Sequence, residues 1–209
     1  MIELFGSALV TFLVIIDPPG CAPIFASLTR GATRADRRSM AVRSCVIAWG
    51  ILMFFALLGR PMLQALGISL ASFRIAGGIL LFYIAVEMVF EKRTQRREGR
   101  AHSIEGTPEA QDISVFPMAM PMIAGPGSIA SAMLWVSSAE TSVHIAIVLA
   151  AITVVMLLTL ITLLAAGPLM RLIGERIEAV ITRILGVILA ALAAQFVIDG
   201  LKASFPALG

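Results

Sequence analysis

The sequence predicts an all-α, polytopic membrane protein whose six transmembrane helices form two inverted three-helix repeats, with the first and fourth helices broken. The first observation behind this prediction is composition. Hydrophobic residues make up 59% of the 209 residues and charged residues only 14%, whereas a soluble domain carries roughly 25% charged residues. Second, six apolar runs are each long enough to cross a hydrocarbon core, which takes about 20 helical residues. Third, two of these runs are interrupted by proline and glycine.

The first predicted span, residues 2–28, is interrupted near its middle by Asp17-Pro18-Pro19-Gly20. Because lipid offers no hydrogen bonds to freed backbone groups, a helix can break at that depth only inside protein or beside a cavity. A short basic connection, residues 31–44, leads to the second span, residues 45–66. Pro61 is expected to kink or end that helix.

The third predicted span, residues 69–90, carries Arg74 and the pair Gly77-Gly78, which should let neighbouring helices approach closely. The polar stretch that follows it mixes both signs of charge, and we expect a mobile cytoplasmic linker there rather than a site. The single predicted membrane domain, residues 1–209, therefore has three parts. These are repeat 1 (1–90), the cytoplasmic linker (91–112) and repeat 2 (113–209).

The fourth predicted span, residues 113–137, contains the second interruption, at 121–128. Two interrupted helices in corresponding halves of a chain are the best sequence pointer to a transporter's binding site. The fifth span, residues 143–166, is expected to end at Gly167-Pro168, and the sixth covers residues 177–200.

The two halves match each other at nearly one spacing. Sliding the chain by 109 residues aligns residues 74–85 with 183–194, and six of these twelve pairs are identical. Sliding it by 107 residues aligns Pro19-Gly20 with Pro126-Gly127. Since each half holds three spans, the second half enters the membrane from the opposite side, so the repeat is inverted.

Basic residues gather in alternate loops, at 30–43, 92–100 and 171–176, whereas the other loops hold only Arg60 and Lys202. The positive-inside rule makes the basic side cytoplasmic. An even number of spans then places both termini in the periplasm. Although the formal net charge is +3, this confinement of the cations to loops argues against a nucleic-acid partner.

Each half-helix that restarts after a break presents free backbone N–H groups, which can bind an anion without a basic side chain. We therefore predict a site for a small anionic or zwitterionic solute at the paired breaks. The residues assigned to it are Asp17, Pro19, Gly20, Gly125, Pro126, Gly127, Ser128, Ser131, Thr11 and Arg74. The alternative is that the breaks only shape packing and that the hydroxyls bond back to their own helices.

Asp17 is the only acid close to the middle of a span. A charge there costs roughly 2.5–3.5 kcal/mol on insertion scales, so it must be paired, solvated or protonated. We interpret it as a proton or cation site, with Arg74 as a candidate partner. The alternative is a cap on the half-helix that follows.

Signals for other classes of protein are weak. Neither His102 nor His144 has metal-ligand spacing to other donors, no P-loop is present, and no cofactor or metal is expected. Ser128 and His144 could form an intramembrane serine dyad, but the chain shows no third group for it. We expect no enzymatic activity, and an intramembrane enzyme is the third function considered.

Several segments along the whole chain resemble the MarC family of bacterial inner-membrane proteins. They are Asp17-Pro18-Pro19-Gly20, Pro23-Ile24-Phe25, Phe73-Arg74-Ile75-Ala76-Gly77-Gly78, Phe116-Pro117-Met118-Ala119-Met120-Pro121, Ala124-Gly125-Pro126-Gly127-Ser128-Ile129-Ala130, and Gln195-Phe196 ahead of Asp199-Gly200. The resemblance implies a six-span protein of the bacterial inner membrane. It also implies a place in a superfamily with amino-acid and metal-ion exporters of the LysE type.

Taken together, these patterns predict a secondary transporter that exports a small anionic or zwitterionic, amino-acid-like solute across the inner membrane. Asp17 would couple that movement to a proton or cation. The rival hypothesis is a membrane scaffold or accessory subunit that transports nothing. The sequence leaves open the solute, the direction of transport and whether the chain forms a homo-oligomer.

Overall fold

A computed structural model describes residues 1–103 and 112–205, without the side chains of residues 100–103 and 170–176. Every regular element in this part of the chain is helical. In chain order the elements are α1 (Ile2–Ile16), α2 (Pro18–Leu28), α3 (Arg34–Ala65), α4 (Leu70–Val89), α5 (Lys92–Ser103), η2 (Ser114–Ile123), α6 (Pro126–Ser137), α7 (Ser142–Leu164) and α8 (Ala166–Ser204).

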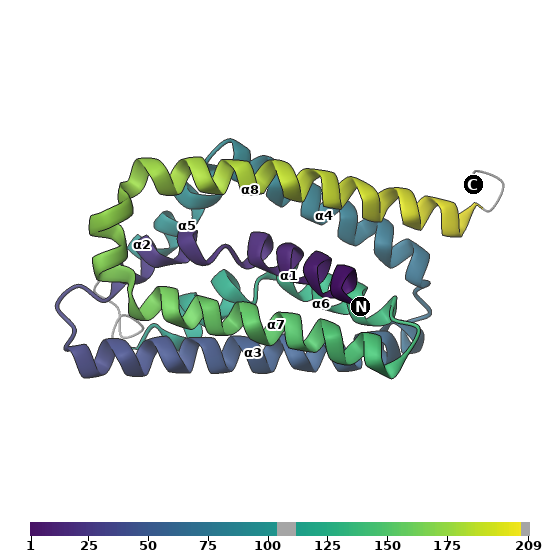
Figure 1. Ribbon diagram of the computed structural model, residues 1–209, viewed down its shortest axis with the longest axis horizontal. Coiled ribbons are helices and arrows are strands. Elements are labelled where there is room, and N and C mark those ends of the chain that lie inside the picture. Colours follow the sequence, from purple (N-terminus) through teal and green to yellow (C-terminus); the bar gives the residue numbers. More distant parts are fainter. Residues whose placement is uncertain (104–111, 206–209) are drawn as a thin grey trace.

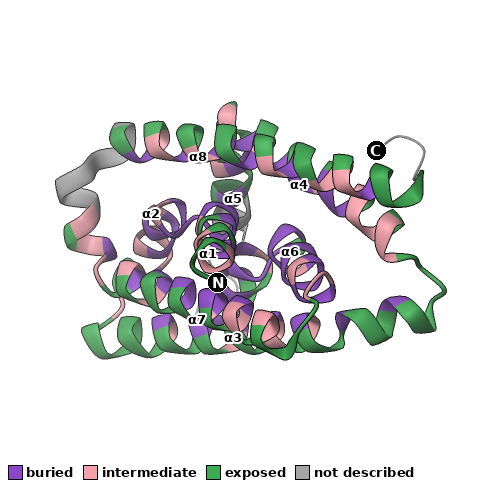
Figure 2. Cartoon of the chain, turned by 45° about the vertical axis from the view of Figure 1, so that its right-hand side comes forward, coloured by how far each residue is buried: buried purple, intermediate pink, exposed green. Residues whose placement is uncertain are grey.

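The helices form two outer pairs with a filled interior between them. Helices α3 and α7 lie side by side on one flank and α4 and α8 on the other, while α1, α2 and α6 lie between the pairs (Figures 1 and 2). The interior span Ile2–Leu28 is 72% buried in its most apolar window, against 22–39% for the four outer spans. The interruption at Asp17 is therefore shielded from lipid by protein, as irregular backbone at this depth requires.

The outer helices present large apolar side chains to the surroundings. Phe54 and Leu57 on α3, Ile161 on α7 and Val187 on α8 are each more than half exposed. Among the described residues, five helical segments are long and apolar enough to cross a membrane, and there are six if the pair formed by η2 and α6, bent by 56°, counts as one span. A soluble protein rarely exposes so continuous an apolar surface, so the chain is an integral membrane protein.

Glycine lets α4 and α8 pack closely along their length, in antiparallel directions. A Cβ on Gly78 would lie 2.8 Å from the carbonyl oxygen of Ala193, and one on Gly200 would lie 2.9 Å from that of Ala71. A Cβ on Gly186 would lie 2.9 Å from the Cβ of Met88. This close approach agrees with the role predicted for the glycine pair of the third span.

The predicted start of the second span is wrong, whereas the predicted ends of the second and fifth spans lie within two residues of the observed helix ends. The basic connection is instead the start of α3, which begins at Arg34 because Thr33 caps it by accepting the N–H of Asp36 at 3.2 Å. Pro61 does not end α3, which continues to Ala65. Gly167-Pro168 does not close the fifth span but lies in the first turn of α8, where a proline removes no helical hydrogen bond.

The largest correction concerns the polar stretch predicted to be a mobile linker. Its first part is the helix α5, packed against α2, α4 and η2, with Arg93 and Arg97 almost fully buried. The rest of the predicted linker, 104–111, lies outside the described residues. Hydropathy predicts a loop for such a stretch because it lacks apolar side chains. Here the contacts of buried arginine side chains hold the helix against its neighbours instead.

The basic loops predicted to share one side do lie at one end of the bundle. The connection from α2 to α3, helix α5 and the junction of α7 and α8 lie together at the left of Figure 1, while the first turn of α1 and the end of α8 lie toward the right. Helix α2 runs from the middle of the bundle toward the basic end, and α6 runs toward the opposite end. Their N-termini therefore both lie near the middle.

Candidate functional site

Asp17 forms the break between α1 and α2. It adopts a left-handed backbone conformation, with φ of 56°, and its N–H still bonds to the carbonyl of Leu13 at 3.0 Å. Its carboxylate accepts the N–H of Gly20 at 3.2 Å and so caps α2. Asp17 therefore caps the half-helix that follows it, but the cap is only one of the contacts of this carboxylate.

Prolines at the first break leave carbonyl oxygens without their helical donors. In a continuous helix the N–H of residue 19 would bond to the carbonyl of Ile15, but Pro19 has no N–H. Arg93 of α5 replaces this donor, because its Nη2 donates to the Ile15 carbonyl oxygen at 2.5 Å. An orphan carbonyl at this depth would cost several kcal/mol, so this contact helps to explain how the break persists.

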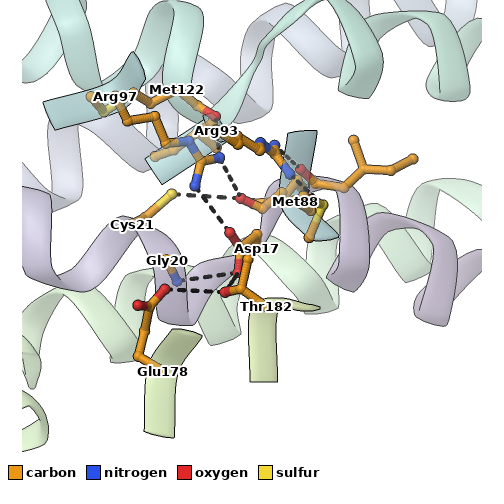
Figure 3. A network of polar contacts seen from close by, with 12 residues as sticks. Asp17, Gly20, Cys21, Met88, Arg93, Arg97, Met122, Glu178 and Thr182 are labelled. Atoms are coloured by element: carbon orange, nitrogen blue, oxygen red, sulfur yellow. Dashed lines mark hydrogen bonds and ion pairs between the residues drawn. The ribbon is translucent and has the colours of Figure 1, made fainter. Parts of the chain in front are cut away.

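The second break repeats this arrangement. Pro126 has no N–H for the carbonyl of Met122, four residues earlier, and Arg97 donates its Nη2 to that oxygen at 3.4 Å. The same nitrogen lies 3.4 Å from the carbonyl oxygen of Ile16 at the end of α1. One arginine from α5 therefore contacts the backbone ahead of both α2 and α6, in the network of Figure 3.

Asp17 pairs with Arg97 in a buried ion pair. Arg97 Nη1 lies 3.1 Å from Asp17 Oδ2, and the two side chains are only 6% and 1% exposed. The predicted partner, Arg74, is not used, since its Nη2 donates to Ser138 Oγ at 2.7 Å. Removing one member of such a pair leaves an uncompensated buried charge, which makes this the most sensitive contact of the site.

A second buried carboxylate adjoins the pair. The hydroxyl of Thr182, on α8, lies 3.1 Å from Glu178 Oε1 and 3.4 Å from Asp17 Oδ1. A hydroxyl has one proton to donate, so it can serve only one of two ionised carboxylates at a time. Figure 3 places this group on the side of Asp17 opposite the arginines.

A cavity of about 170 Å³ opens beside the arginines. The start of α6 forms one wall, with Gly125, Pro126, Gly127 and Ser128, and α1 and α4 contribute apolar side chains and Tyr83. Among the described residues that line it, the charged ones are all arginines of α5. These are Arg93, Arg96 and Arg97.

Charge at this cavity is set by close neighbours. Burial, followed by repulsion from Arg97, lowers the pKa of the Arg93 guanidinium to about 9, so this side chain keeps its proton at neutral pH. Arg96 is half exposed and forms a two-point ion pair with Glu87, at 2.7 and 2.8 Å. The N-terminal end of α6 adds partial positive charge from the same direction.

The assigned hydroxyls have different surroundings. Thr11 donates to the carbonyl of Ser7 at 2.7 Å, and Ser128 donates to that of Ile123 at 2.9 Å, so both bond to nearby backbone. Ser131, one turn beyond Ser128 on α6, is fully buried, and its Oγ has no hydrogen-bond partner among the described residues. Buried polar atoms usually have a partner, so this hydroxyl has capacity left for one.

The glycines of the second break allow close packing of neighbouring groups as well as access to the backbone N–H groups. A Cβ on Gly127 would lie 2.5 Å from Ile84 Cδ1, and one on Gly125 would lie 2.5 Å from the carbonyl oxygen of Pro121. A Cβ on Gly20 would collide with the Asp17 carboxylate. Substitution of any of these glycines would therefore disturb packing together with any ligand contact.

Sequence reasoning missed four residues of this network. Arg93 and Arg97 lie in the stretch predicted to be linker, and Glu178 and Thr182 lie at the start of the last span. Each pair is spaced by four residues, which places both members on one face of a helix. That spacing is the signal that could have drawn attention to them.

Comparison with known proteins gives consistent results. A family model described as MarC family integral membrane protein matches residues 2–205. The UPF0056 membrane protein YhcE of Escherichia coli is 34% identical over 194 residues, covering 93% of this chain and 90% of the relative. YvbG of Bacillus subtilis is 32% identical over 199 residues, covering 95% and 94%, and a UPF0056 membrane protein of Archaeoglobus fulgidus is 35% identical over 200 residues, covering 96% and 93%. No solved structure matches the chain.

Proposed function

The chain belongs to the MarC family of integral membrane proteins, and we propose that it is a secondary transporter of a small anionic or zwitterionic solute. The observation that carries this proposal is the cavity beside α6, where three arginines and a helix N-terminus face the same space. Guanidinium groups and free backbone N–H groups together favour a carboxylate or phosphate. The volume of about 170 Å³ suits a metabolite of amino-acid size rather than a larger ligand.

The buried pair of Asp17 and Arg97 supplies a way to couple the solute to a proton. Arg97 both lines the cavity and neutralises Asp17, so an anion that binds Arg97 competes with the carboxylate for the same guanidinium. Asp17, left buried without its partner, then takes up a proton from solution to become neutral. One proton therefore accompanies each anion.

We also propose an inverted repeat, which would allow alternating access to this site. The first interrupted span, α1 with α2, packs on α7, the middle helix of the second half, and the second interrupted span packs on α3, the middle helix of the first. Helices α3 and α7 pack on each other, as do α4 and α8, so exchanging the halves preserves these pairings. Such symmetry is common in transporters that rock one repeat against the other.

The basic end of the bundle is proposed to be cytoplasmic, with both termini in the periplasm of a bacterial inner membrane. In this orientation α5 covers the site from the cytoplasm. Opening toward the cytoplasm would require α5 to withdraw its arginines, and opening toward the periplasm would leave them in place. Export would begin with the first of these steps.

A binding screen tests the proposal. Purified protein is heated in detergent with single amino acids, dicarboxylates and phosphorylated metabolites, and the unfolding midpoint is recorded. A ligand at 100 times its Kd should stabilise the protein by about 2.7 kcal/mol, and the same ligand should enter proteoliposomes that contain the protein. Arg97→Gln should lose both responses, whereas Arg60→Gln, outside the cavity lining, should keep them.

The screen also separates the proposal from its rivals. If no anion or zwitterion stabilises the protein and only cations do, the cavity has been assigned the wrong charge. If a ligand binds but is not transported, the role is that of a scaffold or accessory subunit. An intramembrane enzyme is disfavoured by Ser128, whose hydroxyl proton is directed to a backbone carbonyl.

A further inference from the structure

A second and larger cavity lies at the basic end of the bundle. Its volume is about 660 Å³, and its walls are the end of α2, the start of α3 and the junction of α7 with α8. These elements meet at the left of Figure 1. None of its lining residues belongs to the Asp17 network or to the smaller cavity.

The charged lining residues described for this cavity are all arginines: Arg34, Arg37 and Arg38. They occupy the first turns of α3, where the helix dipole favours acids and disfavours cations. Asp36 lies in the same turn, but its carboxylate accepts a hydrogen bond from the Thr33 hydroxyl and lines a different hollow. These three exposed cations lie at the helix end that disfavours them, so an anion nearby would stabilise them.

One of these arginines is fixed in orientation. Arg37 Nε donates to the carbonyl oxygen of Thr29 at 3.1 Å, which ties the guanidinium to the last turn of α2. Thr29 is buried, and its own hydroxyl donates to the carbonyl of Phe25 at 2.7 Å. The guanidinium therefore does not have to be ordered by the ligand that it meets, which lowers the entropic cost of binding.

The opposite wall of the cavity is apolar. Phe25 comes from α2, and Leu163 and Leu164 form the end of α7, where its apolar run stops. The cavity therefore combines a cationic rim with a hydrocarbon wall at the level where a transmembrane helix leaves the lipid. A ligand that fits both parts has a phosphate at one end and an alkyl chain at the other.

We propose that this cavity binds the headgroup of an anionic phospholipid of the surrounding leaflet. The phosphate pairs with the three arginines, and an acyl chain lies against the apolar wall. Basic pockets between helices on the cytoplasmic side of membrane proteins suit such headgroups, and each cation strengthens the attraction. The lipid thereby joins α2, α3 and the α7–α8 junction at their cytoplasmic ends.

The test uses purified protein in detergent, with the unfolding midpoint measured against added short-chain phosphatidylglycerol. The midpoint should rise with phosphatidylglycerol and stay unchanged with phosphatidylcholine of equal chain length. The double variant Arg34→Gln/Arg38→Gln should need roughly 30-fold more phosphatidylglycerol for the same rise. Arg37 is left intact because it also bonds to Thr29.

A matched control removes the same charge from the same end. Arg30 and Lys92 are both exposed and lie outside the lining of this cavity, so Arg30→Gln/Lys92→Gln should respond as the wild type does. An equal loss in this control would mean general attraction to anionic lipid and would overturn the proposal. It would also be overturned if phosphatidylglycerol had no effect, or if inorganic phosphate alone gave the same rise.

Discussion

At the scale of single residues, two arginines supply the hydrogen-bond donors that two prolines lack. Pro19 and Pro126 each deprive a carbonyl oxygen of its helical donor, and Arg93 and Arg97 supply one to each. Arg97 also neutralises Asp17, so it stabilises a carboxylate and two interrupted helix ends together. Interactions that share one group in this way are coupled, so their energies should not add.

A double-mutant cycle measures that coupling. Arg97→Gln should lower the free energy of unfolding by about 3–5 kcal/mol, because it removes the partner of a buried carboxylate. Asp17→Asn/Arg97→Gln should be more stable than Arg97→Gln alone, because the amide caps α2 and carries no charge. Thermal or denaturant unfolding in detergent of these two variants and of Asp17→Asn, each compared with wild type, gives the three values of the cycle.

Arg43→Gln is the control for this cycle. Arg43 pairs with Asp112 at 2.7 Å, but its side chain is 61% exposed, so its loss should change stability by less than about 1 kcal/mol. If Arg97→Gln were as mild as Arg43→Gln, the pair with Asp17 would not stabilise the fold as described.

The residues of the first break could be predicted from sequence, but their partners could not. A carboxylate in the middle of an apolar run signals a buried charge wherever it occurs. Its partner is chosen by tertiary structure, and Arg97 is 80 residues away in a stretch without apolar periodicity. Arg74, inside an apolar run, is the partner that hydropathy favours, yet it bonds to Ser138 instead.

At the scale of elements, α5 differs from every other helix in how it is held. It is too polar to be held by apolar burial, and its contacts are made by charged side chains with backbone carbonyls and carboxylates. The spans, in contrast, follow from apolar length and capping, which explains why their existence is predictable and that of α5 is not. Their boundaries differ from the predicted ones because polar extensions such as the start of α3 carry too little apolar signal.

Adding a methyl group at Gly78 tests how closely α4 packs on α8. Gly78→Ala places Cβ 2.7 Å from Val197 Cγ2 and 2.8 Å from a backbone oxygen, so one helix must move. We expect a loss of about 1–3 kcal/mol in the free energy of unfolding.

Gly50→Ala is the matched control, because it lies within α3 and its new methyl group would meet nothing within 4 Å. Alanine is the better helix former, so this variant should be unchanged or more stable by about 0.5–1 kcal/mol. Equal effects at the two positions would show that α4 and α8 do not pack as closely as described.

At the scale of the whole molecule, α1, α2 and α6 occupy the interior, and α3, α4, α7 and α8 surround them (Figures 1 and 2). The spacing of 107–109 residues between matching segments of the sequence indicates two related halves. The packing partners of the halves are exchanged in the way that an inverted repeat requires, which is why we propose one. The proposed orientation of the protein in the membrane is inferred from the positions of the basic loops.

Labelling with a membrane-impermeant maleimide tests that direction. Gln95 on α5 and Thr141 before α7 are exposed, while the native Cys21 and Cys45 are buried. Helix α5 and the start of α7 lie toward opposite ends of the bundle in Figure 1. Gln95→Cys should react only from the cytoplasmic side, and Thr141→Cys only from the periplasmic side. Reaction of both from one side would contradict the proposed arrangement of spans.

Proton movement during solute uptake tests the central claim most directly. Proteoliposomes with a trapped pH dye are supplied with the anion found by the binding screen, and the anion and proton fluxes are recorded together. We expect wild-type protein to move one proton with each anion, Asp17→Asn to move the anion without a proton and without pH dependence, and Arg97→Gln to move neither. Proton-coupled uptake by Asp17→Asn, or normal uptake by Arg97→Gln, would contradict the exchange of Arg97 between Asp17 and the solute.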